Sequence, residues 1–158
     1  MPVVRTILFL LLLLAGGGCA YLRPAPSDGA DAPAVRDLTT VRQVLEAADA
    51  ASAHLLLTQI GRVDAAGLRA PIWRMVYRPF QPDLKQVLVL AGLHGNETAG
   101  VECVLALIQR LRAAPGPGTR FDMDILPLVN PWGWVHDRPL TPAGVDIAVD
   151  FNTFDSQE

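Results

Sequence analysis

Cysteine is scarce in this sequence, and so is any excess of basic charge. The only two cysteines among the 158 residues, Cys19 and Cys103, lie in very different contexts, so we do not expect a disulfide between them. The net charge is −3 and no basic stripe is visible, so nucleic acid is not an implied partner. The N-terminal apolar run, Ile7–Ala15, is too short to span a bilayer. What is present is enough apolar residues for one globular domain behind an apolar leader.

Residues 1–20 have the pattern of an export signal. Arg5 supplies a positive charge, Ile7–Ala15 is the apolar region, and small residues follow it. The small residues before Cys19 resemble a bacterial lipoprotein signal, which would leave Cys19 lipidated and attached to a membrane. Alternatively, the residues up to Ala20 fit an ordinary cleavage site, or the leader stays as an uncleaved anchor. All three readings predict an exported protein, periplasmic or held at a membrane as a lipoprotein.

A change in composition separates the leader from the folded part of the chain. Residues 21–36 are rich in proline, alanine, glycine and aspartate, which predicts a flexible linker. Residues 37–158 are then expected to form the domain. The linker would suit a domain held away from a membrane surface.

Apolar spacing predicts alternating helices and strands in this domain. A helix is expected from Thr40 through Leu56, ending at Ile60 and Gly61, with a turn or short loop at Arg62–Leu68. A second helix is expected at Thr98–Arg112, with Cys103 as a small buried residue in it. Strands are expected at Pro71–Tyr77, Gln86–Ala91 and Met123–Val129. A strand, helix, strand order implies a parallel crossover. We therefore predict the α/β class, with a mostly parallel mixed sheet and flanking helices.

The residues with the clearest chemistry come directly after the buried strand Gln86–Ala91. His94 and Glu97 lie in the turn there, and Gly92 and Gly95 let the backbone turn tightly. Open α/β sheets bind ligands at the carboxyl ends of their strands. An imidazole and a carboxylate are suitable zinc ligands. The position of this histidine and glutamate between a strand and a helix strengthens the prediction of metal binding, because such sites require that placement. The sequence therefore predicts half of a zinc site. The two remaining histidines, His54 and His136, are predicted to be structural.

Several ordered motifs resemble the zinc carboxypeptidases, the carboxypeptidase A-like family. Val87–Gly100 looks like the zinc-binding strand and turn of that family, whose first two zinc ligands fall on the histidine and glutamate just named. Asn130–Gly133 is similar to the family's Asn-Pro-Asp-Gly turn, and Gly144–Phe151 resembles its Gly-Val-Asp-Leu-Asn-Arg-Asn-Phe segment. Residues 60–72 look like its opening hairpin. The resemblance covers residues 40–158 and implies the N-terminal part of the catalytic domain, incomplete at its C-terminus.

The resemblance also implies site residues, and this sequence departs from some of them. Arg138 lies near the family's arginine that polarises the scissile carbonyl. The Asn-Arg pair that grips a substrate's terminal carboxylate falls on Ala148 and Val149, whose side chains cannot make such contacts. The family's third zinc ligand and general-base glutamate lie beyond the residues present. Asp146 and Asp150 carry oxygen ligands, although no spacing argument selects either.

Two functions from different classes follow from these observations. The first is a zinc-dependent hydrolase of the carboxypeptidase type, cleaving a peptide or an acyl-amino acid outside the cytoplasm, with Arg138 stabilising the oxyanion. By this reading the chain is catalytically incomplete. The second is a non-catalytic binding or interaction lipoprotein that retains the fold. Ala148, Val149 and the absent third histidine favour the second function, whereas His94 and Glu97 oppose it.

Overall fold

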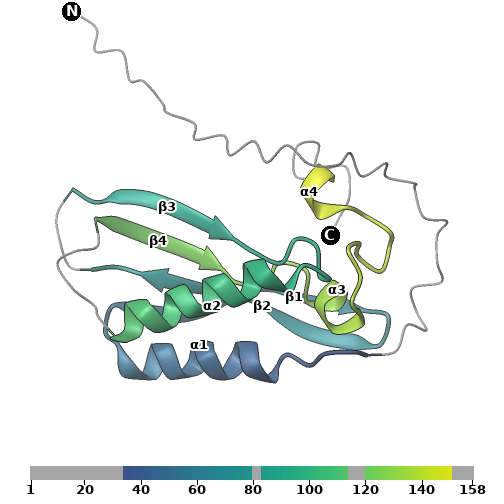
Figure 1. Cartoon of the computed structure of the whole chain (residues 1–158), viewed down its shortest axis with the longest axis horizontal. Helices are drawn as coiled ribbons and strands as arrows, with labels where there is room; N and C mark the ends of the chain where they lie inside the picture. Colours follow the sequence, from purple (N-terminus) through teal and green to yellow (C-terminus); the bar gives the residue numbers. More distant parts are fainter. Residues whose placement is uncertain (1–33, 80–82, 114–119, 151–158) are drawn as a thin grey trace, which may run out of the picture.

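The computed structural model describes residues 34–79, 83–113 and 120–150. The predictions about the leader, Cys19 and most of the linker therefore lie outside the described residues. The described helices and strands are as follows (Figure 1): α1 (Thr39–Ala51), β1 (Leu55–Ala65), β2 (Leu68–Tyr77), β3 (Lys85–Leu90), α2 (Thr98–Ala113), β4 (Phe121–Leu126), α3 (Pro131–His136) and α4 (Ile147–Asp150). None of the helices in these ranges has the length and apolar character needed to cross a membrane.

The four described strands form one mixed sheet in the order β1-β2-β4-β3. β3 and β4 are parallel, and α2 connects them as the predicted crossover. The pairs β1–β2 and β2–β4 are antiparallel. The predicted α/β class, with a mixed sheet and flanking helices, is confirmed. Among the described strands, however, parallel pairing is confined to β3–β4, because the chain enters the sheet through an antiparallel hairpin.

The predicted extent of the first helix and the loop expected after it are both wrong, because the hairpin of β1 and β2 occupies this region. α1 ends at Ala51, and Ser52 already has extended backbone angles. β1 begins at Leu55 and pairs with β2 as far as Ala65 opposite Leu68, so most of Arg62–Leu68 is strand. The tight turn between the strands has positive φ angles at its two central residues, Ala66 and Gly67. The leucines that continued the helical spacing belong to β1, because cross-strand pairing outweighs a weak local pattern. The hairpin that the family resemblance implied is present.

The core lies between the sheet and the helices α1 and α2, which lie together beneath it in Figure 1. Its fully buried side chains come from both layers, and include Val41, Leu45, Met75, Tyr77, Val101, Ile108 and Ile125. Cys103 was expected to join this core but is exposed. It lies outside the apolar stripe of α2, which runs through Val101, Val104, Leu105, Ile108 and Leu111.

The other face of the sheet carries charge at its centre. Asp124 on β4 accepts hydrogen bonds from Arg74, at 2.8 Å from Nε, and from Arg78 on the segment after β2. Leu56 on β1 and Leu88 on β3 lie in the same cross-strand row as Asp124, and their side chains are 57% and 58% exposed. Successive side chains of a strand point to opposite faces, so each of these exposed leucines has buried or half-buried neighbours along its strand.

Candidate metal centre

The turn that carries His94 and Glu97 is held at the carboxyl ends of β3 and β4. The backbone N–H of Val129 donates to the carbonyl oxygen of Ala91 at 3.0 Å, and that of Asn130 donates to Gly92 at 2.8 Å. Gly92 has a φ of +64°, and a Cβ there would lie 2.6 Å from the Leu128 side chain. A glycine is therefore needed for the chain to leave β3 in this direction.

The turn packs directly against the first turn of α3. A Cβ on Gly95 would lie 1.9 Å from the backbone carbon of Gly133, so the two backbones are in contact. Asn130 joins the same two segments. Its side chain accepts the N–H of Gly133 at 2.8 Å as the N-cap of α3, and it donates to the carbonyl of Leu93 at 3.4 Å. Pro131 follows as the first helical residue, which explains the local pattern Asn-Pro-Trp-Gly.

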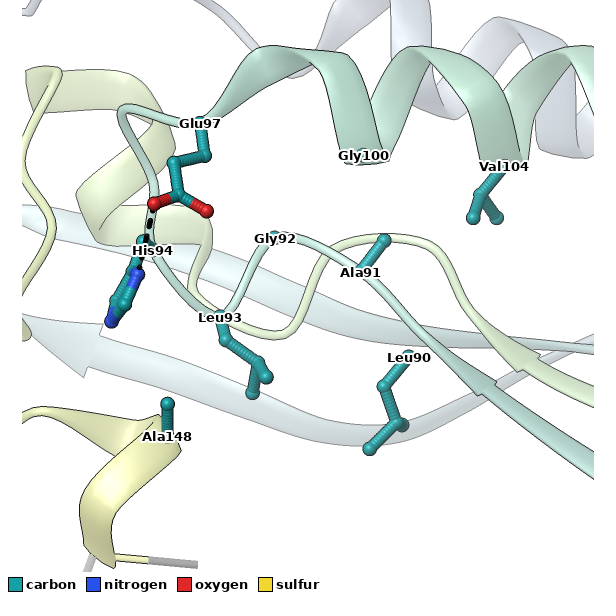
Figure 2. Close-up of a pocket in the computed structure, with 9 residues that line it drawn as sticks. All are labelled: Leu90, Ala91, Gly92, Leu93, His94, Glu97, Gly100, Val104 and Ala148. Atoms are coloured by element: carbon teal, nitrogen blue, oxygen red, sulfur yellow. Dashed lines mark hydrogen bonds and ion pairs between the residues drawn. The ribbon is translucent and has the colours of Figure 1, made fainter. Parts of the chain in front are cut away.

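His94 and Glu97 face one another across this turn. His94 Nδ1 lies 3.2 Å from Glu97 Oε1, and Figure 2 shows this contact at the start of α2. Zinc bonds of about 2.0–2.1 Å in tetrahedral geometry would place two ligand atoms roughly 3.3 Å apart. The separation and the chemistry of the two donors therefore fit a shared zinc ion. The predicted pair of ligands is brought together by the fold.

Asp146, in the segment before α4, contacts the opposite nitrogen of the same imidazole. Its Oδ1 lies 3.0 Å from His94 Nε2 and also accepts the N–H of Ala148 at 3.0 Å. The sequence allows Asp146 as an oxygen ligand. The structure instead places it where it orients the His94 ring, the usual position of a carboxylate behind a metal-binding histidine. No sequence spacing pointed to this pairing, because the two residues meet only through the fold.

The imidazole of His94 is held between two carboxylates. Partial burial disfavours its charged form, but the hydrogen bonds with Asp146 and Glu97 outweigh that effect and raise the pKa of His94 above its ordinary value. Since metals bind the neutral imidazole, protons compete with a metal ion for this ring more strongly than for an ordinary histidine. Burial is uneven across the pair, because the His94 side chain is 16% exposed and that of Glu97 is 72% exposed.

A pocket of about 450 Å³ opens beside these two residues (Figure 2). Its other lining residues are mostly apolar and come from the end of β3, from the turn after it, from α2 and from α4: Leu90, Ala91, Gly92, Leu93, Gly100, Val104 and Ala148. Within the ranges that the structure describes, no group of three or more His, Cys, Asp or Glu side chains is arranged to hold a metal. The described site therefore has two candidate ligands.

The remaining predicted residues lie in other surroundings. Arg138 is exposed directly after α3, where its backbone N–H donates to the carbonyl of Gly133 at 2.8 Å. Its part in a reaction stays a prediction. His54 Nδ1 lies 3.2 Å from the carbonyl of Arg78. His136 Nδ1 lies 2.9 Å from the carbonyl of Trp132, and the two rings are stacked. Both histidines thus have the structural contacts expected of them.

One protein-family model matches part of this chain. A family model described as the succinylglutamate desuccinylase/aspartoacylase catalytic domain matches residues 83–151, which include the turn and Asp146. No curated protein matches the sequence significantly.

Solved structures share the fold. A metallo-carboxypeptidase from Burkholderia cenocepacia is 20% identical with a TM-score of 0.62, and the match covers 74% of this chain and 33% of that one. A metallo-carboxypeptidase from Pseudomonas aeruginosa, in complex with (2-guanidinoethylmercapto)succinic acid, is 18% identical with a TM-score of 0.59, covering 74% and 32%. A candidate metallopeptidase from Shewanella denitrificans is 25% identical with a TM-score of 0.57, covering 70% and 39%. The matched part is thus about a third to two fifths of those chains.

Proposed function

We propose that this chain, which matches the N-terminal part of the zinc carboxypeptidase-like catalytic domain, is a zinc-dependent hydrolase component acting on peptide or acyl-amide bonds outside the cytoplasm. The observation that carries the proposal is the 3.2 Å approach of His94 Nδ1 to Glu97 Oε1 at the ends of β3 and β4. The carboxylate of Asp146 behind the same imidazole supports a metal-binding role for the pair.

The chain's own residues have distinct roles in this proposal. His94 and Glu97 would hold the zinc ion, and Asp146 keeps the imidazole of His94 turned so that Nδ1 faces Glu97. When bound, zinc supplies a Lewis acid that polarises a carbonyl group and makes water more acidic. Arg138 would stabilise negative charge on the substrate's carbonyl oxygen.

The substrate class follows from the surroundings of the pair. The matching family model is that of desuccinylases and aspartoacylases, which favours an acyl-amino acid, and the Pseudomonas aeruginosa neighbour binds a succinic acid derivative, which favours a carboxylate-bearing substrate. Ala148 lines the pocket next to His94, and Val149 beside it is 66% exposed. Neither side chain can grip a terminal carboxylate, so recognition there would depend on other groups.

We also propose that this chain alone lacks part of the catalytic site. The described residues supply two candidate ligands, whereas catalytic zinc sites typically use three protein ligands. We therefore expect the chain to bind zinc and to hydrolyse substrates weakly or not at all. A chain that binds no zinc and hydrolyses neither substrate would support the alternative, a binding lipoprotein that retains the fold.

Zinc content and hydrolysis of the full chain test this proposal. We expect about one zinc per chain for the wild type, and near-complete loss of zinc for His94→Ala and Glu97→Ala. His54→Gln is the matched control, because His54 contacts the carbonyl of Arg78 instead of the candidate site. Hydrolysis is measured on a peptide with a free carboxylate and on an N-acyl amino acid. Equal zinc content in His94→Ala and the wild type would refute the site.

Export through the leader is a separate part of the proposal. The sequence Gly16-Gly17-Gly18-Cys19 supports lipid attachment at Cys19. Expression in a bacterial host with labelled palmitate should label the wild type but not Cys19→Ala, and the label should fractionate with membranes. Cys103→Ala is the control, since Cys103 lies in α2 and should not affect labelling. A soluble cytoplasmic wild-type protein would contradict export.

A further inference from the structure

The segment that precedes α1 is anchored on the candidate metal centre by one arginine. Arg36 Nη1 donates to the carbonyl oxygen of Gly95 at 3.3 Å and to that of Trp134 at 3.1 Å. Its Nη2 pairs with Asp137 at 2.5 Å. The guanidinium also lies 5.2 Å from the centre of the Trp134 ring. One side chain therefore joins the turn after β3 to the end of α3.

Backbone contacts fix the place from which this side chain reaches. The N–H groups of Val35 and Arg36 both donate to the carbonyl of Val135, at 2.7 and 3.1 Å. The indole N–H of Trp134 donates to the carbonyl of Asp37 at 3.0 Å. Because the segment is held on both sides of Arg36, the guanidinium is already positioned for its contacts. The side chain is only 25% exposed.

Gly95 is the inner residue of the turn that sets the two proposed ligands. The backbone N–H of Glu97 donates to the carbonyl of His94 at 3.2 Å and closes this turn around Gly95. On one side Gly95 lies against the backbone of Gly133, and on the other its carbonyl accepts from Arg36. Loss of the arginine would leave that carbonyl without its charged donor and would remove the contact that holds the turn on the side away from Gly133.

We propose that Arg36 is a positioning residue that holds the turn so that His94 Nδ1 and Glu97 Oε1 converge on one metal ion. This inference rests on the proposed zinc-binding function. The pair with Asp137 is partly exposed, at 46% for Asp137, and contributes little by itself. The two carbonyl contacts carry the effect, because a planar guanidinium can serve several acceptors that a lysine ammonium cannot reach together.

Zinc affinity of the full chain, measured by competition with a chromogenic chelator, tests the role. We expect Arg36→Ala to weaken zinc binding about 10-fold and Arg36→Lys about 3-fold. Arg74→Ala is the matched control, because Arg74 is similarly exposed, at 36%, and pairs with Asp124 on the sheet. This control should lower stability but leave zinc affinity unchanged. Wild-type affinity in Arg36→Ala or Arg36→Lys would overturn the inference while the zinc site itself stands.

A second readout does not depend on zinc. In the metal-free chain, ¹⁵N order parameters of the Gly95, Asn96 and Glu97 amides should fall in Arg36→Ala, or in Arg36→Lys if the alanine variant does not fold. They should be unchanged in Arg74→Ala. If the wild type binds no zinc, the proposed function fails, and unchanged order parameters in the Arg36 variants would separately overturn the positioning role.

Discussion

Asp146 Oδ1 lies 3.0 Å from Nε2 of His94, although the two residues are 52 positions apart in the sequence. The contact occupies one ring nitrogen and leaves the other facing Glu97. When the imidazole is neutral, a proton on Nε2 donates to Asp146, and Nδ1 keeps its lone pair for a metal. The pairing thus selects the nitrogen that is available as a ligand.

Removal of the Asp146 carboxylate should weaken metal binding without removing a ligand. We expect Asp146→Ala to lower zinc affinity by about 10-fold or more, because the His94 ring loses its orienting acceptor. Chelator competition measures the change. Asp150→Ala, in which the changed residue lies in α4, is the control and should bind zinc like the wild type. Equal affinities for all three proteins would show that Asp146 does not orient His94.

The contact between Gly95 and Gly133 should make alanine intolerable at position 95. The added Cβ would lie 1.9 Å from a backbone atom, so the turn and α3 must separate. We expect Gly95→Ala to lower the free energy of unfolding by about 3 kcal/mol in urea titrations. Gly100→Ala provides the contrast, because the added Cβ would meet only Ala91, at 4.0 Å. This substitution should stabilise α2 by about 0.5 kcal/mol. Similar stability for the two variants would argue against the close packing.

Leu55 and Leu56 distinguish the observed strand from the helix that the spacing predicted. Leu55 is 3% exposed and Leu56 is 57% exposed, as expected for neighbours on opposite faces of β1. We expect Leu55→Ala to lower the free energy of unfolding by about 3 kcal/mol, and Leu56→Ala by less than about 0.5 kcal/mol. Urea unfolding of both variants checks this. Equal losses would place both leucines in the core.

The ion pairs of Asp124 should make the free energy of unfolding depend on pH. Burial would raise the pKa of this carboxyl, but hydrogen bonds from Arg74 and Arg78 outweigh it and hold the pKa below its ordinary value. The contribution of Asp124 to folding stability is therefore fully present at pH values above the ordinary carboxyl pKa, and it is lost as the pH falls below about 4. Asp124→Asn should cost about 1 kcal/mol at neutral pH, with a shrinking difference from the wild type in acid.

A second variant controls for the general effect of removing an acidic residue. Asp64 is 61% exposed and lies 3.5 Å from Arg69 at the end of the hairpin. Asp64→Asn should change stability by less than about 0.5 kcal/mol at any pH. Parallel stability curves for the wild type and Asp124→Asn down to acid pH would show that Asp124 keeps its ordinary pKa.

Local patterns were enough to predict much of the chain. The strand β3, the helix α2 after it and the turn with His94 and Glu97 follow from a continuous apolar run, a helical stripe and glycines placed where the backbone must turn. These features depend on neighbours in the sequence. The predicted burial of this strand on both faces was wrong, because β3 lies at the edge of the described sheet and Leu88 is 58% exposed. The extent of the first helix and the burial of Cys103 were predicted wrongly, since strand pairing and helix rotation depend on distant partners.

A histidine and a glutamate directly after an apolar strand were predictable from the sequence alone, because strand, turn and helix signals are local and the two residues are three positions apart. The groups that surround these two residues depend on the tertiary fold. Asp146 behind His94 and Arg36 on the carbonyl of Gly95 come from segments 52 and 59 positions away. Hydrogen bonds between such distant residues form only when packing of the sheet, α3 and the flanking segments brings their polar groups together.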